Sequence, residues 1–253
     1  RFASSDFFDG AVRSALEYAA QLWENQINDD FTTVPSGIEF SVRNPSSDRS
    51  DANRQITLDE PIDDLRIFVG ASDQPLRESR DTLAFAGPDG YDAIGDVFRS
   101  RISNNFRDNG TVTKFEPFVG TMSFVPDKPW RFDLEGSPDD GIDFVSVAAH
   151  EIGHVLGIGA SGIFKKIGAG ASFDGVNARD VNGGYPIPLE SNLDHIEEGF
   201  NNDSTLMDPT YSGTRVTPTD FELAILADIG YDIDGFEAQG SKPPIATDEG
   251  EVI

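Results

Sequence analysis

The sequence predicts a mixed α+β fold, because helix-like and strand-like patterns both recur along the chain. In the segment from Gly10 to Ile27, apolar side chains return at helical spacing. Apolar and polar residues alternate over residues 38–42, and residues 65–70 (LRIFVG) form a short apolar run, so both are expected to be strands. The apolar segment from Asp143 to Gly159 has an apolar side and a glycine-rich end that suits a helix stop. We therefore expect helices that pack against a sheet.

Weaker patterns fill in the order of the remaining elements. Further strands are expected at residues 82–86, 121–125 and 130–134, and a short helix at residues 96–107. Residues 44–64 are polar and residues 168–192 are rich in Gly, Asn, Asp and Pro, so both are expected to be irregular loops.

A last helix is expected to start at Thr217. Pro218 suits its first turn, and Asp220 completes a pattern that resembles a capping box. The helix should run to about Asp228, and Gly230 should end it. Residues 232–253 contain Pro, Gly and acidic residues, which predicts an acidic tail or linker.

The composition narrows the class of partner. The 253 residues carry a formal net charge of -26, and no cysteine is present. Binding to nucleic acid is disfavoured because a phosphate backbone needs clusters of Lys and Arg. The lack of cysteine excludes disulfides and thiolate metal ligands, and no apolar run of about 18 residues exists to insert into a membrane. The opening RFASSDFFDG indicates a trimmed or mature start rather than a signal peptide.

The strongest motif is His150-Glu151-Ile152-Gly153-His154, an H-E-x-x-H sequence within the expected apolar helix. Helical positions i and i+4 share one face about 6 Å apart, so both imidazoles can reach one zinc ion at about 2.0 to 2.1 Å. Glu151 lies beside that face, where it can act as general base for a water activated at the metal. The ordinary explanation, two surface histidines on a helix, fits poorly with so apolar a segment.

A zinc site of this kind needs a third protein ligand and an open position for water. The chain has three histidines, so His195 is the one remaining imidazole. The alternatives are that His195 is a lone loop histidine and that a carboxylate supplies the third ligand. The candidate carboxylates belong to the neighbouring segment, namely Glu190, Glu197 and Glu198.

Three features together resemble the metzincin zinc peptidases over about the C-terminal half of the chain. They are HEIGHVLG, which matches HExxHxxG through Gly157, the segment TLMDPTY around Met207, which is similar to the methionine turn, and the order helix, third histidine, methionine, final helix. The usual third-histidine position is occupied by Ala160. The resemblance therefore places the ligand after an insertion, at His195, as in leishmanolysin-like members and in bacterial exported enzymes with a loop similar to NGGYPIPLE.

The resemblance also implies roles for three supporting residues. Gly157 would let the chain leave the helix sharply with a positive φ. Met207 would form an apolar floor beneath the ligands. Tyr211 could stabilise the oxyanion of a tetrahedral intermediate, although metzincin members with a ligand tyrosine place it two residues after the methionine and Tyr211 lies four after it. Core packing or a wall of the substrate pocket is the simpler explanation for Tyr211.

The architecture that follows is metzincin-like. An upper subdomain (about residues 1–159) would hold a twisted mixed sheet backed by two main helices, and an irregular lower subdomain (about residues 160–231) would end in the C-terminal helix. The whole catalytic domain would span residues 1–231. An extended peptide is expected to lie in the cleft between the subdomains and to pair with an edge strand at residues 121–125. The segment from Asp208 to Val216 would shape the substrate pocket.

The function expected from these features is that of a zinc-dependent endopeptidase acting on protein or peptide substrates. We expect a monomer that is secreted or attached to the cell surface, with a bacterial source. The oxygen-rich segment Ser172 to Gly184 is compatible with calcium but does not match the EF-hand pattern. Two alternatives stay open: a zinc peptidase of another class with Glu as third ligand, and a non-enzymatic adhesion or binding module.

Overall fold

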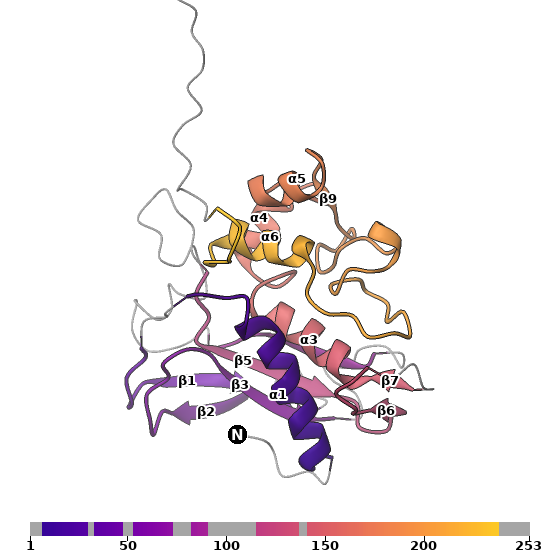
Figure 1. Cartoon of the computed structure of the whole chain (residues 1–253). Coiled ribbons are helices and arrows are strands. Elements are labelled where there is room, and N and C mark those ends of the chain that lie inside the picture. Colours follow the sequence, from indigo (N-terminus) through magenta and orange to yellow (C-terminus); the bar gives the residue numbers. More distant parts are fainter. Residues whose placement is uncertain are drawn as a thin grey trace, which may run out of the picture.

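The computed structural model of the chain describes residues 7–29, 33–47, 53–72, 82–90, 115–136 and 141–237. These residues form a mixed α+β fold, as predicted. Figure 1 shows strands β1, β2, β3, β5, β6 and β7 with helices α1 and α3 in one half of the molecule, and strand β9 with helices α4, α5 and α6 in the other. The helix expected at residues 96–107, and all of the expected tail beyond residue 237, lie outside the described residues.

Helix α1 (Gly10–Glu24) forms where the helical periodicity predicted it. The Asp9 side chain caps it by accepting hydrogen bonds from the backbone N–H groups of Ala11 and Val12. Its buried side packs against helix α3. The Trp23 indole N–H donates to the carbonyl of Ala149 (2.9 Å), which fixes α1 to the helix that carries the H-E-x-x-H motif.

The strands form several small sheets instead of the single sheet expected. Strands β1 (Glu39–Arg43) and β2 (Asn53–Thr57) form an antiparallel pair. A second, mixed sheet has the order β3-β5-β4, in which β3 (Arg66–Ala71) runs parallel and β4 (Ala84–Pro88) antiparallel to β5 (Val119–Phe124).

Two predictions about these strands were wrong. Residues 44–64 are not a continuous loop, since they contain β2, whose largely exposed side chains give no apolar alternation. The strand predicted at residues 121–125 exists as β5, but it is the central strand of its sheet and is buried along its length. It cannot be an edge for an incoming peptide. Strand β4 occupies an edge of the described sheet.

Helix α3 (Phe144–Val155) packs against α1 on one side and against β4 and β5. It is preceded by a short parallel pair, β6 (Trp130–Arg131) and β7 (Ile142–Asp143), so the strand expected at residues 130–134 is shorter than predicted. The first residue of the helix, Phe144, is fully buried in a cluster of aromatic rings that includes Phe124 and Trp130. This apolar anchorage holds the motif helix firmly on the sheet.

The C-terminal half is more regular than the sequence suggested. Several short elements precede helix α6. They are helix α4 (Gly162–Ile167), helix α5 (Val176–Val181), the antiparallel pair β8 (Ser172–Phe173) and β9 (Ile187–Pro188), and the 3-10 turn η2 (Phe200–Asn202). The prediction of an irregular loop at residues 168–192 was therefore wrong. The reason is local: Asp228 of α6 is buried and accepts hydrogen bonds from the N–H groups of Asn177 and Ala178, which fixes the start of α5.

The last helix, α6 (Asp220–Ile229), starts later than predicted. Its N-cap is Thr219 rather than a residue near Thr217, and its capping box uses Glu222 and not Asp220. Gly230 ends the helix, as predicted.

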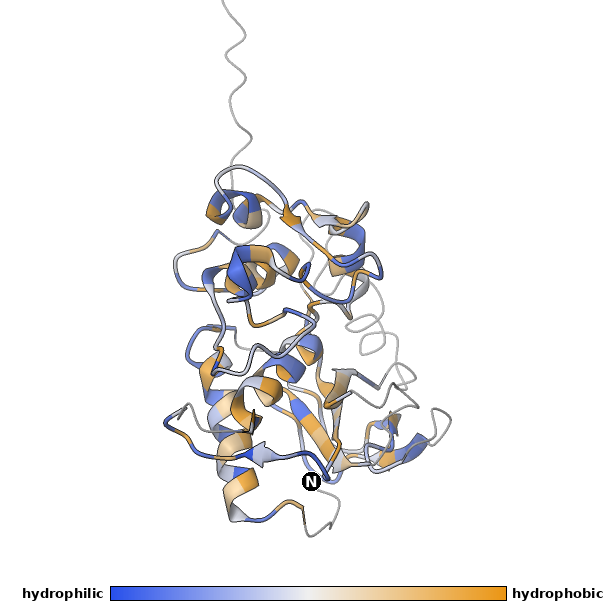
Figure 2. Cartoon of the chain, turned by 90° about the vertical axis from the view of Figure 1, so that its right-hand side faces the viewer, coloured by the Kyte–Doolittle hydropathy of each residue, from blue (hydrophilic) through white to orange (hydrophobic). Residues whose placement is uncertain are grey.

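Helices of both halves carry hydrophobic and hydrophilic residues interleaved (Figure 2). Within the described ranges, none of the helices is long and apolar enough to cross a membrane.

Candidate metal centre

Helix α3 places His150 and His154 on one face, one turn apart. Their Nε2 atoms lie 3.1 Å from each other. The helix is N-capped by Asp143, whose side chain accepts from the N–H of Ser146, and its apolar faces are held by α1 and the sheet. The spacing of four residues on a helix brings these two histidine side chains together.

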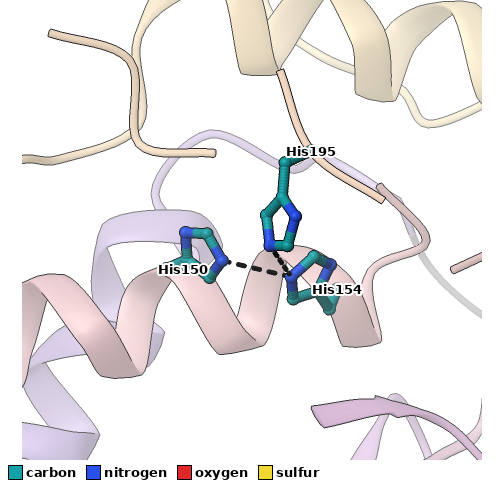
Figure 3. A group of neighbouring side chains, drawn as sticks. All are labelled: His150, His154 and His195. Carbon is teal, nitrogen blue, oxygen red and sulfur yellow. Dashed lines mark hydrogen bonds between the residues drawn. The ribbon is translucent and has the colours of Figure 1, made fainter. Parts of the chain in front are cut away.

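His195 completes a cluster of three imidazoles, and it comes from a segment between β9 and η2. Its Nε2 lies 3.2 Å from Nε2 of His154, and one ligand nitrogen from each ring falls within 4.8 Å of the others. Figure 3 shows the three rings turned toward one common point. Two nitrogens bound tetrahedrally to one zinc at 2.0 to 2.1 Å would lie about 3.3 Å apart, so the observed spacing fits a zinc ion.

The outer ring nitrogens of the motif histidines are held by the backbone. Nδ1 of His150 lies 2.8 Å from the carbonyl of Leu206, and Nδ1 of His154 lies 2.9 Å from the carbonyl of Ile158. A carbonyl only accepts, so each Nδ1 carries the proton and each Nε2 turns a lone pair toward the cluster. Such second contacts orient the histidine ligands of metal sites.

The cluster consists of neutral rings. Burial lowers the pKa of His150, His154 and His195 to about 3, with a further lowering from the neighbouring imidazoles. Neutral imidazole is the form that binds a metal.

Glu151 is buried beside the cluster, at 6 % exposure. Its Oε2 has no hydrogen-bond partner within the described part of the chain, and burial raises the pKa of Glu151 to about 8. A buried carboxyl oxygen without a partner is costly in a folded protein and is typical of a position that meets a ligand or water during function.

The backbone around Met207 connects two of the three histidines. The Leu206 carbonyl accepts from His150, and the Met207 carbonyl accepts from the N–H of Ile196, the residue that follows His195. Met207 itself is fully buried. A Cβ added at Gly153, within the motif, would lie 2.6 Å from its Sδ, so the methionine packs directly beneath the motif helix.

Gly157 has a φ of 111°, which agrees with the predicted sharp exit from the helix. Tyr211 lines the same cavity as the histidines, and its hydroxyl oxygen accepts a hydrogen bond from the N–H of Asp143 (3.1 Å). The phenol is thereby attached to the start of α3.

The rival carboxylates are not part of the histidine cluster. Glu190 accepts from the N–H of Glu198, and Glu198 accepts from the Thr210 hydroxyl. Over the residues that the structure describes, the three histidines are the one group whose ligand atoms meet closely enough to share a metal. In the segment expected to suit calcium, Asp174 is paired with Arg179, and calcium stays a prediction.

The histidines lie in a cavity of about 810 Å³. The cavity is lined by residues 82–86, by residues between 142 and 165, and by residues between 192 and 216. Residues from both sides of the boundary expected near residue 160 therefore line the cavity. A volume of this size is in the range of ligand-binding clefts. The edge strand β4 forms part of one wall.

Comparison with protein families places part of the chain. Residues 103–167, which include the H-E-x-x-H helix, match the family model of the matrixins, a group of peptidases. Curated proteins gave no match to the chain. The matrixin match and the three-histidine cluster together support a zinc metallopeptidase activity in general.

Sequence reasoning missed several residues that shape this site. Glu222 was overlooked although the spacing of Thr219 and Glu222 is that of a capping box, and its Oε1 accepts from the N–H of Met207 (3.1 Å). Asp208, which follows Met207 directly, was noted only as the start of a pocket segment, yet it is 7 % exposed and lines the cavity. The carbonyls of Leu206 and Ile158 belong to the backbone, so residue types in the sequence could not identify them as acceptors.

Proposed function

We propose that the chain is a zinc-dependent endopeptidase that hydrolyses peptide bonds of proteins. The observation that carries the proposal is the convergence of three neutral imidazoles beside Glu151, whose buried Oε2 has no partner among the described residues, within one open cavity. His150, His154 and His195 would hold the metal. Bound zinc would supply a Lewis acid, which acidifies water and polarises a carbonyl group.

The protein groups divide the remaining work. The Leu206 and Ile158 carbonyls keep the His150 and His154 lone pairs turned inward. A bound metal dication would lower the pKa of Glu151 from the value near 8 that burial alone produces, so that Glu151 would be a carboxylate. This carboxylate would accept a proton from the attacking water and then deliver it to the nitrogen of the leaving amine. Tyr211 accepts through its oxygen from Asp143, so its own proton is left for donation to an oxyanion in the cavity. Gly157 and Met207 support the ligands structurally.

Cleavage within a chain, rather than at its end, is supported by the shape of the walls. Strand β4 lies at the edge of the described mixed sheet and lines the cavity. An extended peptide could add to this edge through backbone hydrogen bonds, which place its scissile bond without requiring a terminus. This replaces the earlier assignment of residues 121–125 as the docking strand.

The setting of the enzyme belongs to the same proposal. The matrixin match supports a secreted or cell-surface location in general. Several further features remain expectations. They are a bacterial source, a monomeric state and calcium binding. The division into a catalytic domain at residues 1–231 and an acidic tail at residues 232–253, with subdomains that meet near residue 160, is also an expectation.

The test combines metal content with peptide hydrolysis on identically purified variants. We expect one zinc per wild-type chain, loss of zinc in His195→Ala, and retained zinc but at least a hundredfold lower turnover in Glu151→Gln. Glu17→Gln is the matched control, because Glu17 is an exposed glutamate of helix α1 that does not line the cavity. Zinc retained in His195→Ala and lost in a Glu197, Glu190 or Glu198 variant would show a carboxylate ligand. Bound zinc without hydrolysis of any peptide would favour a non-enzymatic binding module.

A further inference from the structure

Besides Glu151, a second carboxyl that lines the cavity has one oxygen without a good hydrogen bond from the described residues, and it belongs to Asp208. Asp208 is 7 % exposed and lines the cavity. Its Oδ1 accepts from the N–H of Thr210 (3.0 Å). Its Oδ2 makes no hydrogen bond of good geometry with a described residue, although the backbone N–H of Gly199 also acts on this carboxyl as a weaker donor. A buried carboxyl oxygen in this condition is destabilising unless a ligand satisfies it.

The surroundings of Asp208 are acidic. Asp203 also lines the cavity and is exposed, and Glu198 is linked to the same turn through the Thr210 hydroxyl. Burial and then the nearby charges of Asp203 and Glu198 raise the pKa of Asp208. Asp203 and Asp208 line the cavity, and Glu198 does not. We call these three residues together the acidic wall.

The described residues that line the cavity do not neutralise this wall. Lys165 is the single lysine or arginine among them, and its Nζ lies 3.1 Å from Asp194. The nearby Arg215 is bound to Asp143 and to the carbonyls of Asp133 and Leu134. The acidic wall therefore lacks a cation of its own in the described part of the cavity.

The three carboxyls are too spread out to hold a single metal ion. Their oxygens do not meet within the distance at which the three histidines do, as judged over the described residues. A guanidinium group carries five N–H donors on a planar fork, and a lysine ammonium carries three on a flexible stem. Either group can satisfy a buried carboxyl and still interact with a second one nearby.

We propose that the acidic wall is a subsite for a basic side chain, Arg or Lys, of a peptide substrate, with the buried carboxyl of Asp208 as its main acceptor. The inference rests on the proposed function, because the same cavity holds the histidine cluster and Glu151. The basic residue would therefore bind in the same cavity as the scissile bond. A site built around an unpaired polar group rejects side chains that leave it unpaired, so selection against neutral residues should be strong.

Binding to an inactive protein tests the subsite. The zinc-loaded Glu151→Gln chain would be titrated with fluorescent heptapeptides in which one Arg is moved through a neutral sequence, each paired with a peptide carrying Gln at the same position. We expect one position at which Arg improves binding about tenfold or more over Gln. Adding Asp208→Asn should bring this ratio to within about twofold. Adding Asp127→Asn, the same charge change at an exposed turn, should leave it intact.

A second variant covers the case in which Asp208→Asn does not fold, as judged by zinc content and thermal unfolding. Asp203→Asn alters an exposed side chain and should lower the Arg-to-Gln ratio by about threefold. No position with a preference for Arg, or a preference that persists in both variants, would overturn the proposal.

Turnover of the same peptides by the wild-type chain separates the two proposals. A preference for Arg in binding without any cleavage would refute the peptidase while the subsite stands. Cleavage that is indifferent to basic residues, together with equal binding of the Arg and Gln peptides, would refute the subsite while the peptidase stands.

Discussion

Gly159 lies against Asp194 so closely that a β-carbon on Gly159 would overlap the Asp194 carbonyl oxygen. Gly159 follows the exit of the chain from helix α3, and Asp194 directly precedes His195. The contact between Gly159 and Asp194 therefore positions His195 next to the helix that carries the H-E-x-x-H motif. Gly159 also has a φ of 72°, a backbone conformation that residues with a side chain rarely adopt.

We predict that Gly159→Ala lowers the zinc affinity at least tenfold. The new methyl group meets backbone atoms, so the segment that carries His195 must move away, and about 1.4 kcal/mol of lost binding energy corresponds to tenfold. The affinity would be measured by competition with a chromogenic chelator. Gly162→Ala is the control, because a β-carbon there meets nothing within 4 Å. Equal affinities of the two variants would show that the Gly159–Asp194 contact does not position His195.

Glu222 supports the site from the opposite side. Its Oε1 accepts from the Met207 N–H, and its Oε2 accepts from the Thr219 N–H (2.9 Å) and from the Thr219 hydroxyl. Glu222→Gln turns an acceptor into a donor that faces these groups. We expect a loss of about 1 to 3 kcal/mol in the free energy of unfolding, measured with urea on the zinc-free protein.

The same substitution should also weaken zinc binding, since the Leu206–Met207 backbone holds His150 and the neighbour of His195. Glu17→Gln, at an exposed position of helix α1 away from the cavity, is the matched control for both measurements. If Glu222→Gln lost stability but kept the wild-type zinc affinity, the Met207 backbone would not transmit its position to the ligands.

The sequence predicted the motif helix well for a physical reason. His150, Glu151 and His154 depend only on helical spacing, which is a local property. His195 was reached by counting histidines and from the resemblance, because its approach to α3 depends on contacts distant in sequence. Backbone acceptors such as the Leu206 carbonyl leave no trace in side-chain patterns.

Sheet order could not be predicted for a related reason. Strand β5 is buried on all residues, yet its sequence VGTMSF alternates polar and apolar side chains, which indicates a strand without showing which strands flank it. Strand β2 was missed since its exposed, polar sequence (NRQIT) looks like a loop until it pairs with β1. Pairing is set by tertiary contacts, which override local propensity.

Asp143 gives the fold a predicted pH dependence. It is fully buried at the N-cap of α3, and it accepts from Arg215 Nη2 (2.7 Å) and Nε (3.0 Å) and from the Ser146 N–H and hydroxyl. Burial alone would raise the pKa of this carboxyl, but the hydrogen bonds from Arg215 and Ser146 together hold it below the ordinary 3.8. The stabilisation is therefore complete above the ordinary value and is lost as pH falls through the lower, folded-state value.

We predict that Asp143→Asn lowers the free energy of unfolding by about 3 kcal/mol at pH 7, because it leaves the Arg215 charge partly buried without its partner. The difference from wild type should shrink below about pH 4. Urea unfolding would be followed from pH 7 to pH 3 with a chelator present throughout, so that loss of metal at low pH contributes nothing. Asp127→Asn controls for the change in net charge. A gap that stays constant down to pH 3 would show that the Asp143 carboxylate is not the source of the stabilisation.

A substitution at Tyr211 can distinguish a structural role of its hydroxyl group from a catalytic role. Its oxygen accepts from the buried N–H of Asp143, and it lines the cavity. Tyr211→Phe should therefore lower the free energy of unfolding by about 1 kcal/mol, since that N–H loses its acceptor. If the hydroxyl proton also stabilises the oxyanion, kcat should fall roughly a hundredfold while KM and zinc content stay the same. We expect both effects, measured by urea unfolding and by steady-state peptide hydrolysis. A stability loss with unchanged kcat would assign Tyr211 to holding the start of α3 alone, and the oxyanion would then need another donor.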